Sequence, residues 1–374
     1  MKLFLLTVTS FFIAYSGKWG NIKAFEPYSQ WFLWIGFFML WLWLLSHTYY
    51  ISGHNWPETD DKPKKIRLNT LDALKALVSW FNAFQRTYAI APGLYYTGDR
   101  YDPELPLLVT SNYHMTVFLL LRAVHGFSIR LLVIDTDGIN VWCAAGKGAF
   151  NNTAIMKQIN RFQNHLIADG KKIELVLPKL ALSGVDLHGL RQEGIRPVIG
   201  PIKTKTLPAF LSQTKLEDQT QDVFLFDFKS RLFTWLPGLV QYMLYGLILV
   251  MGLLGIEAFW GLRAPMGIIP LIALLTTVYP LLFPWLPGRG FAVKGLWLAG
   301  SVGVAMAGSV IFNLMTTHEA LSAIVFVFAV SIFFGLSYTG NSPVSNYTRV
   351  RRETARFLPI NVILFLTSFV LYLF

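Results

Sequence analysis

Long stretches of hydrophobic residues lie at both ends of this chain, and they constrain its fold more than any other feature. Residues 31–51 are long enough to cross a bilayer as a helix, and a shorter stretch at residues 3–15 precedes them. No convincing cleavage site separates these two stretches, so we expect an uncleaved transmembrane hairpin over residues 1–51. Five further spans are predicted at residues 236–258, 264–286, 291–315, 320–336 and 357–374. With 54% hydrophobic residues, the chain is too apolar for an ordinary soluble enzyme.

Small residues recur at four-residue spacing within the third of these C-terminal spans. They are Ser301, Ala305 and Ser309. Such a pattern lets two membrane helices approach closely, so we expect this face to pack against a neighbouring helix.

The basic residues predict the orientation of the chain in the membrane, because Lys and Arg accumulate in short cytoplasmic loops. They follow the N-terminal hairpin, precede the C-terminal spans and occupy alternate loops between those spans: Lys62, Lys64, Lys65, Arg67, Lys229, Arg231, Arg289, Lys294, Arg349, Arg351, Arg352 and Arg356. We therefore predict a multi-pass protein of the cytoplasmic (inner) membrane whose middle region faces the cytoplasm. The same residues account for the net charge of +11, and no nucleic-acid partner is predicted.

The middle region, residues 57–235, reads as a single α/β domain between the N-terminal hairpin and a five-helix domain at residues 236–374. A helix is expected at residues 71–86, with Asn69 or Thr70 as its cap. Strands at residues 107–110, 129–135, 173–177 and 197–199 then alternate with helices near residues 116–124, 152–168 and 185–193. This alternation predicts a mostly parallel sheet covered on both faces, with any ligand beyond the carboxyl ends of its strands.

Cys143, the only cysteine, follows one of these predicted strands. Asp137 and Gly138 supply a turn, and a short helix is expected to begin after Asn140 as its N-cap. The positive end of the helix dipole then favours a thiolate at Cys143, and Lys147 adds a nearby cation. A thiolate is a soft donor suited to soft or borderline metals. The alternative is that Cys143 fills space in the core, as many free cysteines do.

Several common cofactor motifs are excluded by single residues. A Walker A loop fails because Val141 stands in place of its first Gly and Gly148 follows Lys147. The dinucleotide-binding pattern GxGxxG fails because Asn151 occupies its third glycine position. The sequence also cannot form an internal disulfide or hold an iron–sulfur cluster alone, since it has one thiol.

The string NVWCAAGKG at residues 140–148 resembles the cap-helix signature N(V/I)WCAAGKG of the HgcA family, the membrane corrinoid proteins of anaerobic mercury methylation. Every position matches. Further segments resemble the corrinoid domain of that family in the expected order: APGLYYTGD (91–99), PLLVTSNYHMT (106–116), DTDGI (135–139), VLPKL (176–180) and GPIKTKTLPAFL (200–211). The resemblance covers about residues 66–235, and the hydrophobic C-terminal third also fits; the N-terminal hairpin is a departure from the family pattern.

The resemblance implies a Rossmann-like, flavodoxin-like fold that binds a cobalamin-type cobalt corrinoid. It implies that the Cys143 thiolate is the lower axial ligand of cobalt and the catalytic residue. The cofactor-binding residues that it implies are Thr110, Asn112, Tyr113, Asn140, Val141, Trp142, Cys143, Ala144, Ala145, Gly146, Lys147, Gly148, Gly200 and Pro201. Trp142 either covers the corrin or anchors the cap helix, and Lys147 either binds a corrin carboxamide or caps a carbonyl.

Other corrinoid proteins use a histidine in a DxHxxG motif. Asp186 and His188 fit that pattern, but Arg191 replaces its final Gly, so we expect His188 to be a helix-surface residue.

The implied activity is a corrinoid-dependent methyltransferase that converts Hg(II) to methylmercury. An axial thiolate pushes electron density onto cobalt, which favours transfer of a carbanion-like or radical methyl from methylcobalt(III) to a soft electrophile. The resemblance also implies a separate ferredoxin-like iron–sulfur electron donor and a methyltetrahydrofolate-type methyl donor. Two alternatives stay open: a membrane corrinoid methyl carrier for another acceptor of the acetyl-CoA or one-carbon pathway, and a transporter with a regulatory α/β domain.

Overall fold

The computed structural model describes residues 61–81, 88–167, 172–260, 268–312, 315–339 and 347–373, with isolated residues between 9 and 39. The chain divides into two compact units, Met1–Asn55 with Leu244–Ile268 and Trp56–Met243 with Ile269–Phe374. The second unit contains an α/β domain and C-terminal apolar helices. The predicted hairpin at residues 1–51 lies almost wholly outside the described residues and stays a prediction.

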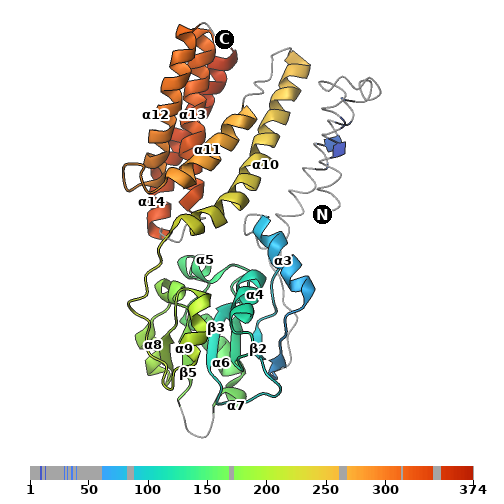
Figure 1. Ribbon diagram of the computed structural model, residues 1–374, viewed down its shortest axis with the longest axis vertical. Helices are drawn as coiled ribbons and strands as arrows, with labels where there is room; N and C mark the ends of the chain where they lie inside the picture. Colours follow the sequence, from blue (N-terminus) through green and yellow to red (C-terminus); the bar gives the residue numbers. More distant parts are fainter. Residues whose placement is uncertain are drawn as a thin grey trace. The chain divides into compact units, whose positions relative to one another are not determined.

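The α/β domain is built on a six-stranded mixed sheet in the order β1-β2-β4-β3-β5-β6 (Figure 1). The strands are β1 (Lys64–Lys65), β2 (Gly93–Tyr96), β3 (Leu107–Ser111), β4 (Arg130–Ile134), β5 (Glu174–Leu177) and β6 (Arg196–Ile199). All neighbouring pairs are parallel except β2 with β4. The predicted mostly parallel sheet is therefore confirmed, whereas the short strands β1 and β2 at one end of the strand order were not foreseen.

Two hydrophobic clusters bury the sheet from opposite faces. Leu132 and Ile134 of β4 point into one cluster, and their neighbours Leu131 and Val133 point into the other, as the two-residue repeat of a strand requires. Each of these four side chains is fully buried. Covering both faces explains why the parallel strands read as continuous hydrophobic runs.

Short helices provide the cover: α3 (Thr70–Phe81), α4 (His114–Ala123), α5 (Val141–Gly146), α6 (Asn152–Arg161), α7 (Gln163–Leu166), α8 (Leu187–Gln192) and α9 (Leu207–Leu211), with the 3₁₀ helices η2 (Lys179–Gly184) and η3 (Thr204–Thr206). The expected single helix at residues 152–168 is wrong, because Phe162 separates α6 from α7. Its backbone leaves the helical region at φ −104° and ψ 17°, and its ring is 1% exposed within the core.

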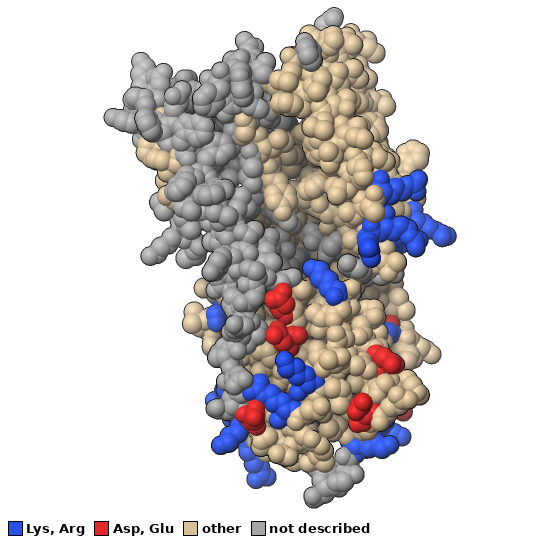
Figure 2. Space-filling model, turned by 180° about the vertical axis from the view of Figure 1, so that it is seen from behind, with Lys and Arg blue, Asp and Glu red and all other residues tan. Residues whose placement is uncertain are grey.

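Five C-terminal helices overlap the five predicted spans: α10 (Phe228–Trp260), α11 (Ile268–Leu282), α12 (Phe291–Ile311), α13 (Thr317–Tyr338) and α14 (Tyr347–Leu373). Three stretches among the described residues, Phe291–Ile311, Thr317–Tyr338 and Thr348–Leu373, are long and apolar enough to cross a membrane. In Figure 2 the charged side chains lie on the α/β domain and at one end of the helical part, and the rest of its described surface in this view carries none.

The close contact between α12 and α13 is made by glycines. A Cβ atom added at Gly335 would lie 2.8 Å from Ala292 Cα, and one added at Gly295 would lie 2.9 Å from the Ser331 carbonyl carbon. The predicted packing face of Ser301, Ala305 and Ser309 is wrong, because Ser301 and Ala305 are exposed. Glycine allows a closer backbone approach than serine or alanine, so the glycine face determines how the two helices cross.

Two buried charged residues, one in α12 and one in α14, have structural partners. Lys294 and Glu353 are each 8% exposed. The Lys294 ammonium donates to the Phe283 carbonyl oxygen at 2.8 Å, and Glu353 Oε1 accepts from the Ala292 backbone N–H at 2.6 Å. Each side chain thus forms a hydrogen bond with a backbone group that has no partner at a helix end. These bonds account for the two buried charges, and no role in ion transport is needed to explain them.

Candidate functional site

The candidate site lies where β3 and β4 end side by side. These strands pair in parallel, and their register brings Ser111 opposite Ile134. The chain after β3 continues through Asn112 and Tyr113 into α4, and the chain after β4 continues through residues 135–140 into α5. Both loops therefore leave the sheet at the same edge, where ligands of such sheets bind.

Asn112 joins the two loops. Its side-chain oxygen accepts hydrogen bonds from the backbone N–H groups of Thr136 (3.1 Å) and Gly138 (3.0 Å), and its amide nitrogen donates to Asp135 Oδ1 at 3.1 Å. The residue is completely buried. One side chain from the end of β3 therefore determines the path of the loop that leads to Cys143.

A tight turn and a helix cap then place Cys143. Asp137 and Gly138 both adopt left-handed backbone conformations, with φ of 57° and 64°. Asn140 caps α5 as predicted, since its Oδ1 accepts a hydrogen bond from the Cys143 backbone N–H at 2.9 Å. Cys143 consequently lies in the first turn of α5 and is half-buried.

The signature residues around Cys143 divide by the side of α5 on which they lie. Val141, Ala144 and Ala145 are buried in the core beneath the helix, whereas Trp142, Cys143 and Gly146 are half-buried. Lys147 and Gly148 are exposed. Gly148 has a φ of 76° and ends the helix, so the backbone alone accounts for a glycine at that position.

Gly184 of η2 is a site residue that the sequence analysis missed. A Cβ atom at this position would lie 3.0 Å from Ala145 Cα and would collide with the Phe150 carbonyl oxygen. Only glycine permits this approach of η2 to α5. The position of the cap helix therefore depends on a residue about forty positions further along the chain, for which the sequence contains no local signal.

Tyr113 lies close to Cys143. Its side chain is 3% exposed and packs with Ala76 and Met115. Burial raises the pKa of the Tyr113 hydroxyl to about 12, and the nearby charge of Cys143 contributes to the rise. Tyr113 is thus a neutral hydroxyl at physiological pH beside the cysteine.

Two hydroxyl groups at the end of β3 lack partners. Thr110 is 1% exposed and Ser111 is fully buried. Neither Thr110 Oγ1 nor Ser111 Oγ has a hydrogen-bond partner among the described residues. Successive residues of a strand point to opposite faces of the sheet, so these two hydroxyls do not form one site.

The remaining predicted residues lie apart from this group. Gly200 and Pro201 follow β6, and β3 and β5 lie between that strand and β4. Gly200 packs against β5, where its N–H donates to the Leu177 carbonyl oxygen at 2.9 Å. His188 is an exposed residue of α8, as predicted, and Asp186 caps that helix by accepting from the His188 N–H at 3.0 Å.

No group of three or more His, Cys, Asp or Glu side chains that could hold a metal occurs in the part of the chain that the structure describes. Comparison of the chain with protein-family models and with curated proteins gives no match.

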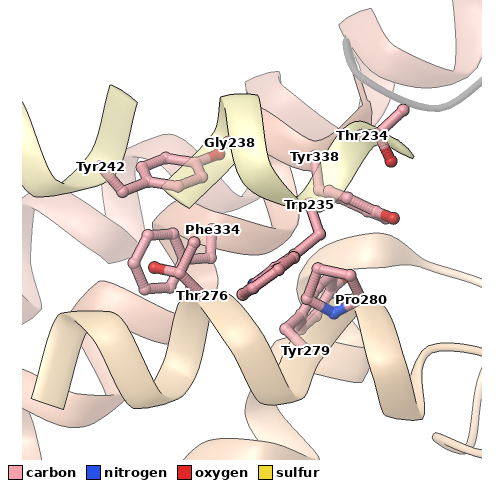
Figure 3. A pocket seen from close by; sticks show the side chains of 9 residues that line it. All are labelled: Thr234, Trp235, Gly238, Tyr242, Thr276, Tyr279, Pro280, Phe334 and Tyr338. Atoms are coloured by element: carbon pink, nitrogen blue, oxygen red, sulfur yellow. The ribbon is translucent and has the colours of Figure 1, made fainter. Parts of the chain in front are cut away.

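Two cavities elsewhere carry less functional information. One lies between α10, α11 and α13, where aromatic rings including Trp235, Tyr279 and Tyr338 face one another (Figure 3). Its volume of about 10 Å³ holds at most one water molecule, so this cavity does not favour a transported substrate. The other is an open groove of about 560 Å³ between α6 and α8, and Cys143 lines neither.

Proposed function

We propose that this protein is a membrane-bound, corrinoid-dependent methyltransferase that methylates inorganic Hg(II). One observation carries the proposal: Cys143 lies half-buried in the first turn of a capped helix at the ligand edge of a mostly parallel sheet. The nine residues around it resemble the cap-helix signature of the HgcA family at every position.

The strand order supports a flavodoxin-like domain. The four consecutive parallel strands β3, β4, β5 and β6 occur in space as β4-β3-β5-β6. This is the 2-1-3-4 order of doubly wound folds, which bind cofactors where the strand order reverses. In this chain that point lies between β3 and β5; Thr110 is in β3, and Asn112 and Tyr113 follow it.

The residues at this edge suit a corrin ring. A corrin ring would bring its own nitrogen ligands, and Cys143 would supply one thiolate from the protein. When bound, the corrinoid supplies a methyl group on cobalt that a soft electrophile such as Hg(II) can accept. Asn140 and Asn112 orient the thiolate through the helix cap and the loop.

The chain's own residues also define what its partners must provide. Its one thiol cannot hold an iron–sulfur cluster, so a separate ferredoxin-like protein would supply low-potential electrons. The methyl group would come from a methyltetrahydrofolate-type donor. We propose a multi-pass location in the cytoplasmic membrane with the α/β domain on the cytoplasmic side, based on the apolar helices and the basic residues near their ends.

A comparison of Cys143→Ala with His188→Ala tests the proposal. Each full-length variant is purified from cells grown with cobalamin, and its visible absorption spectrum is recorded. Its conversion of Hg(II) to methylmercury is then measured with a low-potential chemical reductant and a chemical methyl donor added. We expect a bound corrinoid in the unmodified protein, background methylation for Cys143→Ala, and unchanged methylation for His188→Ala. A colourless unmodified protein, or full activity of Cys143→Ala, would refute the assignment. Methyl transfer to another acceptor in place of Hg(II) would favour the methyl-carrier alternative.

A further inference from the structure

Helix α3 turns its apolar side away from the protein. Its leucines and phenylalanine recur at intervals of three or four residues and are strongly exposed: Leu71 61%, Leu74 56%, Leu77 48% and Phe81 43%. Its inward side includes Asp72, Ala76 and the fully buried Ser79. In a water-soluble protein the apolar stripe of such a helix faces the core, so this orientation is the reverse of the usual one.

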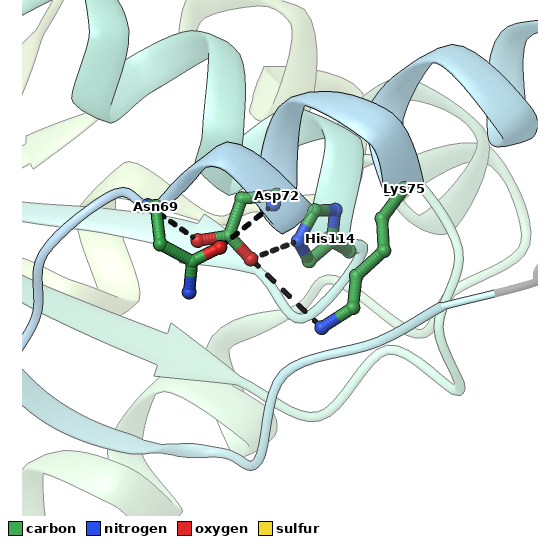
Figure 4. A network of polar contacts seen from close by, with 4 residues as sticks. All are labelled: Asn69, Asp72, Lys75 and His114. Atoms are coloured by element: carbon green, nitrogen blue, oxygen red, sulfur yellow. Dashed lines mark hydrogen bonds and ion pairs between the residues drawn. The ribbon is translucent and has the colours of Figure 1, made fainter.

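A polar network holds the helix in this orientation (Figure 4). Asp72 Oδ1 lies 3.0 Å from Nε2 of His114, a residue of α4 that is 5% exposed, and 3.9 Å from Lys75 Nζ. The Asp72 side chain also caps the helix start, because its Oδ2 accepts from the Asn69 N–H while Asn69 Oδ1 accepts from the Asp72 N–H. Turning the leucines inward would break this network, so the exposed stripe is built into the fold.

The surroundings of α3 indicate what covers the stripe. Exposed cations precede the helix at Lys62, Lys64, Lys65 and Arg67; Lys64 and Lys65 form β1, and Lys65 pairs with an Asp99 carboxylate oxygen at 3.6 Å. At its other end, Trp80 Nε1 donates to the Phe233 carbonyl oxygen at 3.0 Å, and the two rings stack at 5.7 Å. Phe233 belongs to the first turns of α10, so α3 is attached to the start of a C-terminal apolar helix. An apolar stripe next to cations matches the acyl chains and anionic headgroups of a bilayer surface.

We propose that α3 lies in the surface plane of an anionic bilayer, with Leu71, Leu74, Leu77 and Phe81 among the acyl chains. The basic residues before the helix contact the headgroups. This proposal rests on membrane attachment by the apolar helices and is independent of corrinoid chemistry. Because Ala76 packs against Tyr113 and Met115, the same helix holds the loop after β3 close to the membrane surface.

Site-directed spin labelling tests the proposal in the full-length protein. Cys143 is replaced by Ser, single cysteines are introduced by Leu74→Cys and Leu77→Cys, and the control is Lys157→Cys on the exposed surface of α6. Each labelled protein is reconstituted into vesicles that contain phosphatidylglycerol. We expect labels at 74 and 77 to be relaxed by oxygen and shielded from a water-soluble nickel complex, and the label at 157 to show the opposite.

Two results would overturn the proposal. Equal accessibility of the three labels to nickel would leave the stripe in water. Protection of positions 74 and 77 from both reagents would mean that protein covers it, either another part of this chain or a second copy. A further variant of the protein labelled at position 74 has Lys62, Lys64, Lys65 and Arg67 replaced with Gln. We expect increased nickel accessibility at position 74 in this variant, and an unchanged value would contradict the role of anionic lipid.

Discussion

The side-chain oxygen of Asn112 lies 3.1 Å from the backbone nitrogen of Thr136 and joins the end of β3 to the loop that carries Cys143. Asn112 is fully buried, and Thr136 is 1% exposed. The position of Cys143 relative to the sheet therefore depends on a residue about thirty positions earlier in the chain.

Replacing Asn112 with Leu should destabilise the α/β domain. The substitution keeps the branching of the side chain but leaves the N–H groups of Thr136 and Gly138 without an acceptor, at about 1–3 kcal/mol for each unsatisfied group. Urea unfolding of the full-length protein in detergent, followed by limited proteolysis of the domain, measures the loss. The exposed control Lys157→Ala should change the free energy of unfolding by less than about 0.5 kcal/mol.

Two substitutions at Asn140 test whether its side-chain hydrogen bond stabilises α5. Asn140→Ala removes the acceptor of the Cys143 N–H and should cost about 1 kcal/mol, whereas Asn140→Asp keeps an acceptor and should cost less. The same unfolding measurement checks this order. Equal losses for the two variants would show that the cap does not stabilise α5.

A pair of glycine substitutions tests the crossing of α12 and α13. Gly335→Val introduces a side chain where a Cβ would already meet the backbone of Phe291 and Ala292, and overpacking of this kind costs about 1–3 kcal/mol. Gly300→Val, with no atom within 4 Å of its Cβ position, should be tolerated. Thermal stability in detergent compares the two. Equal stability would mean that the helices do not cross as described.

The network at Asp72 should make stability fall in acid. Burial raises the pKa of Asp72, but hydrogen bonds from His114 and Asn69 and the charges of His114 and Lys75 outweigh it, so the pKa lies below its ordinary value. Because the pKa is lowered in the folded state, ionised Asp72 stabilises the protein at pH values above its ordinary pKa of about 4. This contribution is lost as the pH falls through the lowered pKa. Thermal unfolding from neutral to acidic pH should show that the advantage over Asp72→Asn disappears at low pH. A constant difference would contradict this account.

Features that depend on local interactions could be predicted from the sequence. The cap of Asn140 on α5, the four parallel strands and the five C-terminal helices all follow from neighbouring residues, because helix capping and hydrophobic periodicity act over a few positions. The same reasoning identified His188 as a surface residue. It missed β1 and β2, because β1 consists of two lysines and β2 (GLYY) begins with glycine, and both residue types are depleted in strands.

The sequence alone therefore determined the classes of element and the chemical identity of the candidate site, with its single thiol at a helix start. Only the tertiary structure decided that Asn112 organises the neighbouring loop, that Gly184 lets η2 pack closely against α5, and that α3 turns its leucines outward. Each of these depends on atoms from segments far apart in the chain, whose distances a linear pattern does not contain. An amphipathic pattern shows that a helix has two faces, but the partner that each face meets is selected only when the chain folds.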